Sequence, residues 1–339
     1  MSMLLECVPN FSEGRDSAVL DEIAAAIASV DQVRFLGRDS GLAAHRTVMT
    51  FAGPPEPVVE AAFRAVEAAV RLIDMRDHRG THPRIGAADV CPLIPLRGMT
   101  MAQAADHARR LAHRVGTTLG VPSYLYCLAA QTPERISLAA IRAGEYEGLA
   151  KRMERPDGVP DFGPKRFQAR CGAAVFGARE LMLAYNVNLE GYHLKAAKRI
   201  AARIRESGRR VKGEVVPGLF RGVKAIGWDI EDFSRSQVST NIMDIPAAPL
   251  HSVFEAVREL AEPMASKVDG SELIGLMPRA CLRRAGLHFA ERAGRSLENL
   301  PLDEVYRLGI SGLGLDRVKP FSPDTHLIEH ALGLAEDLI

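Results

Sequence analysis

The densest group of chemically capable side chains lies in one short polar segment, DHRGTHPR at residues 77–84. An imidazole with a pKa of about 6.5 accepts and returns protons near neutral pH, so His82 is a candidate acid–base group. Gly80 and Pro83 disfavour a helix, which predicts irregular backbone around this imidazole. We interpret the segment as a proton-transfer loop. Histidines that only cap loop ends or face solvent are the alternative.

A metal site is a competing interpretation of the same histidines. His78 and His82 have the four-residue spacing of two zinc ligands on one helix face. Gly80 and Pro83 interrupt that helix, so the sequence favours a site without metal. The five cysteines are dispersed and form no C-x-x-C pair, which argues against a structural zinc site and against a disulfide framework.

Three further segments have the chemistry to line a ligand site. NFSEG at 10–14 and RDSG at 38–41 each follow a predicted strand, and Asp39 could accept a ligand amine, although both are equally typical of turns. Residues 157–179 are rich in glycine and proline. Four basic side chains interrupt them: Lys165, Arg166, Arg170 and Arg179. Small residues permit the approach of a flat ligand and cations suit carboxylates, with an ordinary interdomain connection as the alternative.

These segments need a scaffold, and the apolar periodicity predicts one with two similar halves. The first half has predicted strands at 4–11, 33–36, 45–51, 88–96 and 121–127, and predicted helices at 16–30, 58–73 and 102–119. The second half has predicted strands at 180–189, 222–230, 237–245 and 272–277, and predicted helices at 194–206 and 249–264. Residues 74–87 are predicted to be irregular.

Both halves therefore contain the order β-α-β-β-α-β, which is typical of ferredoxin-like units. We predict an α+β fold with two subdomains, residues 1–180 and 181–339, whose sheets face each other with helices outside. Two bare sheet faces buried against one another would leave a cleft where packing is incomplete, and ligand sites tend to lie at such interfaces.

Composition narrows the class of partner. The 339-residue chain carries 43 Lys and Arg against 42 Asp and Glu, which argues against a general nucleic-acid binder. Basic residues gather between Lys198 and Lys212, which we interpret as a solvated helix face and the loop after it. No stretch of about 18 apolar residues predicts a membrane span, and the N-terminus lacks a signal-peptide pattern. We expect a cytoplasmic protein that acts on small molecules.

Ordered sequence blocks over nearly the whole chain resemble one known family. The blocks are VPNFSEG at 8–14, LIDMRDHRGTHPRIGAADVCPLIPLRG at 72–98, PSYLY at 122–126, AIRAGEYEGL at 140–149, PDFGP at 160–164, YNVNL at 185–189, AIGWDIED at 225–232, QVSTN at 237–241 and GSELIGLMP at 270–278. They are similar to the formiminotransferase domain of the formiminotransferase–cyclodeaminase family, which also occurs alone in bacteria. The family boundary between subdomains would fall near Arg179–Leu183.

The resemblance implies a transferase of histidine degradation. Its reaction would move a formimino group from N-formimino-L-glutamate to N5 of tetrahydrofolate, giving 5-formiminotetrahydrofolate and L-glutamate. Tetrahydrofolate would be a co-substrate, no metal would be needed, and the chain would form a homodimer. The family's catalytic histidine corresponds to His82, and its folate-binding stretch corresponds to Gly163–Gly172. The candidate folate- or substrate-binding residues are Asn10, Asp39, Arg84, Tyr126, Gly163, Pro164, Lys165, Arg166, Phe167, Gln168, Ala169, Arg170, Cys171 and Gly172.

Three positions depart from the family pattern. His45 stands where the family usually has Asn, Thr81 stands where Glu is expected before the histidine, and Cys171 stands where mammalian relatives carry Trp. Loss of a carboxylate next to His82 would lower the pKa of that imidazole or change the donor that is accepted. A different donor, such as formiminoglycine, is therefore an alternative. A folate-binding relative without turnover is a second one.

Overall fold

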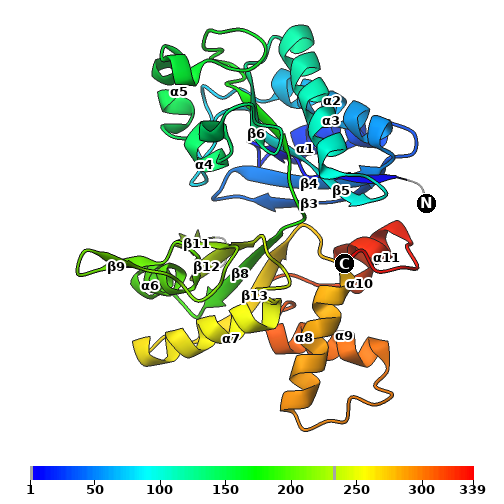
Figure 1. Ribbon diagram of the computed structural model, residues 1–339, viewed down its shortest axis with the longest axis vertical. Coiled ribbons are helices and arrows are strands. Elements are labelled where there is room, and N and C mark those ends of the chain that lie inside the picture. The colour runs from blue at the N-terminus through cyan, green and yellow to red at the C-terminus, as the bar shows by residue number, and fades with distance from the viewer. Residues whose placement is uncertain (1–2, 232–233) are drawn as a thin grey trace. The chain divides into compact units, whose positions relative to one another are not determined.

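Two units make up the computed structural model, which describes residues 3–231 and 234–339 (Figure 1). The first unit extends to Leu181 and the second begins at Met182. Each unit contains a β-sheet covered by helices, so the predicted α+β class with two subdomains is confirmed. No helix in the described ranges is long and apolar enough to cross a membrane.

The N-terminal sheet has an antiparallel core with a parallel extension. Its strands are β1 (Leu4–Cys7), β2 (Asn10–Phe11), β3 (Arg34–Gly41), β4 (Arg46–Gly53), β5 (Ala88–Arg97), β6 (Ser123–Cys127) and β7 (Ala174–Ala178). Both β1 and β2 pair with β4 on one side and β5 on the other, and β3 pairs with β4. Beyond β5, strands β7 and β6 continue the sheet in parallel. The antiparallel core follows the predicted ferredoxin-like connectivity.

Three helices cover one face of this sheet: α1 (Ser17–Ala28), α2 (Pro55–Leu72) and α3 (Met101–Arg114). Asp16 caps α1 as predicted, because its carboxylate accepts hydrogen bonds from the amides of Ala18 and Val19. The core beneath the helices includes Leu5 and Cys7, which alternate along β1 with Glu6 on the other face. The turn at Val115–Leu119, predicted as a continuation of α3, is a π-helical turn.

The opposite face of the β5-β7-β6 region is covered by α4 (Leu138–Ile141) and α5 (Glu145–Met153). Ile141, Leu149 and Met153 from these helices form a second core with Val90 and Tyr124 of the sheet. Short 3₁₀ turns at Pro133–Arg135 and Pro156–Gly158 flank the two helices. This second core holds α4 and α5 beside the predicted proton-transfer loop.

The C-terminal sheet consists of β8 (Leu183–Leu189), β11 (Val223–Ile230), β12 (Arg235–Ile242) and β13 (Val268–Ile274), antiparallel in the order β11-β12-β8-β13. Helices α6 (Leu194–Ile204) and α7 (Leu250–Ala261) pack on one face. Strands β9 (Arg209–Val211) and β10 (Glu214–Val216) form a separate hairpin. The other helices in the described part of this unit are α8 (Arg279–Arg292), α9 (Leu302–Leu313), α10 (Pro323–His326), α11 (Ile328–Leu332) and a 3₁₀ turn at Glu262–Met264.

Several predicted boundaries were wrong, and the causes are tertiary. Residues 38–41 were predicted to be a turn, but they extend β3 because β4 supplies a pairing partner along their whole length. The predicted irregular stretch 157–179 contains β7, whose short apolar run is a strand buried on both faces. The loop predicted after α6 forms the β9–β10 hairpin. Strand β13 starts at Val268, earlier than predicted, and a register irregularity lies between Val268 and Ser271.

Candidate active site

The predicted proton-transfer loop, residues 77–84, lies between α2 and β5 in irregular backbone, as predicted. Gly80 packs against the turn before β4, where a Cβ atom would lie 2.2 Å from the carbonyl oxygen of Ala44. The backbone amide and the hydroxyl of Thr81 both donate to the carbonyl oxygen of Ala43, at 3.1 and 3.2 Å. The loop is therefore fixed to residues 43–44 by a close backbone contact that only glycine permits.

His78 uses both ring nitrogens within this loop. Its Nδ1 accepts a hydrogen bond from Nε of Arg84 at 3.1 Å. Nε2 must then carry the proton, and it lies 2.8 Å from the carbonyl oxygen of His45. Burial lowers the pKa of His78 below its ordinary value. We infer that His78 is a neutral structural imidazole that connects the loop to the turn before β4.

Arg84 connects the loop to α5. Its guanidinium makes a bidentate pair with Glu147, with nitrogen–oxygen distances of 2.8 and 2.6 Å, and also contacts Glu145 at 3.2 Å. The backbone amide of Tyr146 donates to the carbonyl oxygen of Arg84. The hydrogen bond from Arg84 is the main reason that the pKa of Glu147 falls to about 2. The predicted role of Arg84 in substrate binding stays a prediction, since these contacts already occupy its guanidinium.

His82 is held in one tautomer by its own loop. Its Nδ1 lies 2.8 Å from the carbonyl oxygen of Pro83, which can only accept, so Nδ1 carries the proton and Nε2 carries the lone pair. Burial, and then the positive charges of Arg46 and Arg142, lower the pKa of His82 to about 3. The imidazole is therefore a neutral proton acceptor at physiological pH. Once protonated beside two cations, it would be a strong acid.

The two cations near His82 share one buried carboxylate. Asp89 on β5 is fully buried and accepts hydrogen bonds from Arg46, at 2.5 Å, from Arg142, and from the backbone amide of Ile85 at 2.9 Å. Burial alone would raise the pKa of Asp89, but the two guanidinium groups outweigh it and hold the pKa at about 2. Two positive charges thus face one negative charge, which leaves the cluster with a net positive charge near His82.

Asn10 and Asp39 lie on the same sheet face as this cluster. The Oδ1 atom of Asn10 accepts a hydrogen bond from Nε of Arg46 at 3.1 Å, and Nδ2 of Asn10 donates to the carbonyl oxygen of Val8 at 2.9 Å. Asn10 on β2 and Asp39 on β3 both lie opposite Val48 of β4. Arg46 is two residues before Val48, so the side chains of Asn10, Asp39 and Arg46 share one face of the sheet. Asp39 is half-buried there.

The predicted folate stretch runs directly alongside the His82 loop. The amides of Met75 and Ala87 donate to the carbonyl oxygens of Arg170 and Cys171, at 2.8 and 2.9 Å. Gly86 and Gly172 form a bridge in which a Cβ atom on Gly172 would lie 2.2 Å from the carbonyl oxygen of Ile85. The C-terminal end of the stretch is therefore fixed against residues 75–87. The structure brings the two predicted site segments together.

Within the folate stretch the side chains differ in availability. Phe167 packs against Tyr146 with 5.4 Å between ring centroids, and Arg170 donates to the carbonyl oxygen of Arg71 at 2.7 Å. Lys165 and Arg166 are exposed. These two residues are therefore the more available cations of the stretch.

Two further predicted site residues, Tyr126 and Cys171, are buried and have raised pKa values. Tyr126 lies on β6, where burial raises the pKa of its hydroxyl to about 12 while nearby Arg179 acts in the opposite direction. Burial also raises the pKa of the Cys171 thiol, to about 11, so this cysteine is protonated and weakly reactive at neutral pH. Among the described residues, no three His, Cys, Asp or Glu side chains gather as a metal-binding group.

Three residues of this cluster, Arg46, Asp89 and Arg142, are not among those predicted from the sequence. Asp89 carried a usable signal, because a single carboxylate inside the apolar run ADVCPLIPL needs a buried partner. Arg46 is the second residue of a predicted strand, and Arg142 lies in a segment for which no helix or strand was predicted. Nothing in their spacing indicated that both would reach the same aspartate.

The C-terminal sheet carries a different polar cluster on the face away from α6 and α7. Nε2 of Gln237 donates to Oδ1 of Asn188 at 2.7 Å and to Oε2 of Glu272 at 3.1 Å. The indole of Trp228 donates to Oε1 of Gln237 at 3.1 Å. Glu272 also forms an ion pair with Lys319 at 2.6 Å. This carboxamide cluster spans the strands that carry the YNVNL, QVSTN and GSELIGLMP blocks.

Comparisons with known proteins agree with the sequence blocks. A family profile described as the formiminotransferase domain, N-terminal subdomain, matches residues 4–179, and one described as the formiminotransferase domain matches residues 184–333. The chain is 45% identical over 333 residues to a formimidoyltransferase-cyclodeaminase of Sus scrofa, covering 97% of this chain and 60% of that protein. The chain thus spans about three fifths of the length of this relative.

Shorter relatives are matched over most of their length. A glutamate formimidoyltransferase of Thermoplasma acidophilum is 39% identical over 293 residues, which cover 86% of this chain and 93% of that protein. A glutamate formimidoyltransferase of Streptococcus pyogenes serotype M1 is 37% identical over 282 residues, covering 83% and 91%. The resemblance predicted from the sequence blocks is confirmed, and the chain belongs to the formiminotransferase family.

Proposed function

We propose that this chain transfers the formimino group of N-formimino-L-glutamate to N5 of tetrahydrofolate and releases L-glutamate. The observation that carries this proposal is the tautomer of His82. Its Nδ1 donates to the carbonyl oxygen of Pro83, so Nε2 is the unprotonated ring nitrogen. The names of the relatives matched over most of their length support the same reaction.

The chemistry needs one group that both accepts and donates a proton. N5 of tetrahydrofolate attacks the amidine carbon, a carbon–nitrogen bond forms, and the N5 proton passes to Nε2 of His82. The tetrahedral intermediate then breaks its bond to the glutamate nitrogen, which takes the proton back from His82 and leaves as an amine. Since burial and the cations lower the pKa of His82 to about 3, the protonated imidazole is a strong acid for the second step.

The positive cluster gives an anionic substrate a reason to bind near His82. Arg46 and Arg142 oppose the single carboxylate of Asp89, so a substrate carboxylate would complete the charge balance. We propose that Lys165 and Arg166 bind a further carboxylate of folate, with the backbone of Gly163–Gly172 beside the pterin. Asn10, Asp39 and Tyr126 remain proposed contacts, and Arg84 is proposed as a positioning residue instead.

The direct test is a steady-state assay with purified protein, tetrahydrofolate and N-formimino-L-glutamate, read after acid conversion of the product to 5,10-methenyltetrahydrofolate. Saturable turnover is expected. A parallel panel replaces the donor by formiminoglycine, because His45 and Thr81 depart from the family pattern. Preference for formiminoglycine would transfer the proposal to that donor. Folate binding by calorimetry with no product from any donor would contradict an enzymatic role.

We also propose that the protein acts in the cytoplasm as a homodimer, with tetrahydrofolate as co-substrate and without a metal, nucleic acid or membrane partner. Family membership supports the dimer and the co-substrate. Light scattering coupled to size-exclusion chromatography tests the homodimer, and a measured mass of one chain would contradict it. Unchanged turnover after treatment with a chelator is expected, and loss of turnover would contradict the metal-free mechanism.

A further inference from the structure

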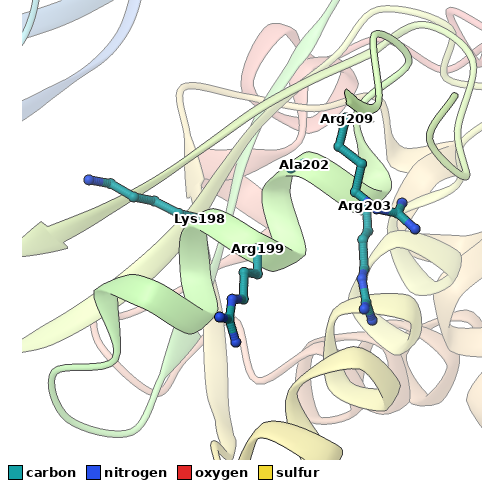
Figure 2. Close-up of a pocket in the computed structure, with 5 residues that line it drawn as sticks. All are labelled: Lys198, Arg199, Ala202, Arg203 and Arg209. Carbon is teal, nitrogen blue, oxygen red and sulfur yellow. The ribbon is translucent and has the colours of Figure 1, made fainter. Parts of the chain in front are cut away.

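An open cavity of about 350 Å³ lies on the C-terminal unit, between the outer surface of α6 and the β9 strand (Figure 2). Its lining residues are Lys198, Arg199, Ala202, Arg203 and Arg209. Four of the five are cations, and Ala202 provides the only small side chain among them. The residues proposed for formimino transfer all belong to the other unit, so this cavity shares no residue with that site.

The cations of this basic cavity are not neutralised within the described parts of the chain. Neither residues 3–231 nor residues 234–339 supply a carboxylate within ion-pair distance of Lys198, Arg199, Arg203 or Arg209. The nearest acidic residue along the chain, Glu206, accepts a hydrogen bond from the amide of Gly222 instead. Like charges gathered without a counter-charge repel one another, and an anion in the cavity would remove that cost.

Arg203 and Arg209 come from different elements, and both are half-buried. The backbone fixes their separation. The amide of Gly208 donates to the carbonyl oxygen of Arg205, Nε of Arg205 donates to that of Gly208, and the amide of Leu219 donates to that of Arg203. These hydrogen bonds therefore fix the backbone from which the two guanidinium groups extend.

The hairpin that carries Arg209 is also well defined. Lys212 and Gly213 both have positive φ angles, 51° and 90°, as the tight two-residue turn of a β-hairpin requires. Arg209 and Arg210 are neighbours on β9, so their side chains point to opposite faces of the hairpin. Only Arg209 lines the cavity, while the guanidinium of Arg210 donates to the carbonyl oxygen of Gly213.

We propose that this basic cavity binds the phosphate chain of a small oligophosphate ligand. Three guanidinium groups offer the forked donors that match phosphate oxygens, whereas the side chain of Lys198 extends away from them (Figure 2). The volume is at the lower end of the range typical of small-ligand sites, roughly 300–1,000 Å³. The near-neutral composition of the whole chain, 43 basic against 42 acidic residues, favours a local site over a nucleic-acid surface.

The test is isothermal titration calorimetry of the full chain with inorganic tripolyphosphate at constant ionic strength. We expect saturable binding of one ligand per chain, weakened by added salt. Arg203→Gln and Arg209→Gln should each weaken binding about tenfold, since each removes one charge-assisted contact. Without ligand, the melting temperature of both variants should equal or exceed that of the parent, because repulsion is reduced. Arg210→Gln removes the same charge from the other hairpin face and should leave the affinity within about twofold.

The proposal would be overturned by a lack of saturable binding, by equal weakening from Arg210→Gln, or by equal affinity for tricarballylate, which carries carboxylates in place of phosphates. The affinities for adenosine triphosphate and for adenosine, measured in the same way, show whether the ligand is a nucleotide or a free phosphate chain. Tighter binding of adenosine triphosphate than of tripolyphosphate assigns a nucleotide. Equal affinities assign the phosphate chain alone, and binding of adenosine with the same affinity contradicts the proposal. No turnover is needed for any of these measurements, so they are independent of the proposed transferase activity.

Discussion

The two sheets share the connectivity β-α-β-β-α-β, yet the buried carboxylate of each sheet has a different kind of partner. On the N-terminal sheet, Asp89 is surrounded by charged partners, Arg46 and Arg142. On the C-terminal sheet, Glu272 is surrounded mainly by carboxamides such as Gln237, with Lys319 as its one charged partner among the described residues. The same framework thus carries a charged cluster in one unit and a largely neutral hydrogen-bond network in the other.

The difference separates two tasks that polar groups perform in a site. Clustered charges produce a field that changes the pKa of a neighbour: burial lowers the pKa of His82 most, and Arg46 and Arg142 lower it further. Carboxamides fix orientation through paired donors and acceptors and add little field. We therefore expect substitutions in the first unit to change proton chemistry, and substitutions in the second to change mainly stability or positioning.

The largest effect should come from His82→Ala. Loss of the proton-transfer group should reduce kcat/KM by about 10²–10⁴-fold while the melting temperature changes little, because His82 lies in a loop. His113→Ala, an exposed histidine on α3, is the matched control and should keep parental activity. Steady-state kinetics on both variants decides the matter. Near-parental turnover by His82→Ala would remove His82 from the mechanism.

The two buried carboxylates should differ in their contribution to stability. Asp89→Asn leaves Arg46 and Arg142 buried beside a neutral group and should lower the free energy of unfolding by about 3–5 kcal/mol. Glu272→Gln retains most hydrogen-bonding capacity and should cost about 1–2 kcal/mol. Urea denaturation measures both values. Equal losses would contradict the distinction between a charged and a largely neutral cluster.

Asp89 should also make stability depend on pH. Its pKa in the folded protein, about 2, is below that of an unfolded aspartate, about 3.9, so its stabilising contribution is complete above pH 4. That contribution should be lost as the pH falls from about 4 to about 2. The difference in unfolding free energy between parent and Asp89→Asn should shrink over this window. A constant difference from pH 5 to pH 2 would contradict the assigned pKa.

A smaller effect is expected from Arg142→Gln on the pH profile. Removing one of the two cations should raise the pKa of His82 and move the acidic limb of kcat/KM upward by about one pH unit. The titration of N5 of tetrahydrofolate is common to both proteins and cancels in the comparison. Arg210→Gln, in the other unit, should leave the limb in place. A coincident limb in parent and Arg142→Gln would contradict electrostatic control of His82.

The smallest effect should come from His45→Asn. Position 45 has a positive φ of 48°, a conformation in which Asn and His are enriched, so the family's usual residue should fit within about 0.5 kcal/mol. His45→Val should cost more, about 1–2 kcal/mol, because a β-branched residue is strained there. Thermal denaturation compares the two. Equal losses would show that contacts of the imidazole with His78 or Glu13 outweigh the backbone.

The fold followed from the sequence wherever the signal was local. Helices α2 and α7 were predicted close to their observed bounds because their apolar spacing is regular. Strand β7 was missed because its residues, AVFGA, are small and become a strand only between β5 and β6. The cluster around Asp89 was missed for the same reason, since Arg46 and Arg142 are distant in sequence and only tertiary packing brings them together.

Backbone hydrogen bonds join the region of the predicted proton-transfer loop to the predicted folate stretch, so local unfolding should expose both segments together. The amides of Met75, Ala87 and Ala173 all donate hydrogen bonds between these two segments. The close contact of Gly86 with Gly172 leaves no room for one segment to move along the other. In native-state hydrogen exchange these three amides should therefore exchange as one cooperative unit, with a common opening free energy. A bound folate would slow all three equally, so a ligand that contacts only residues 163–172 would still be recorded by an amide beside His82.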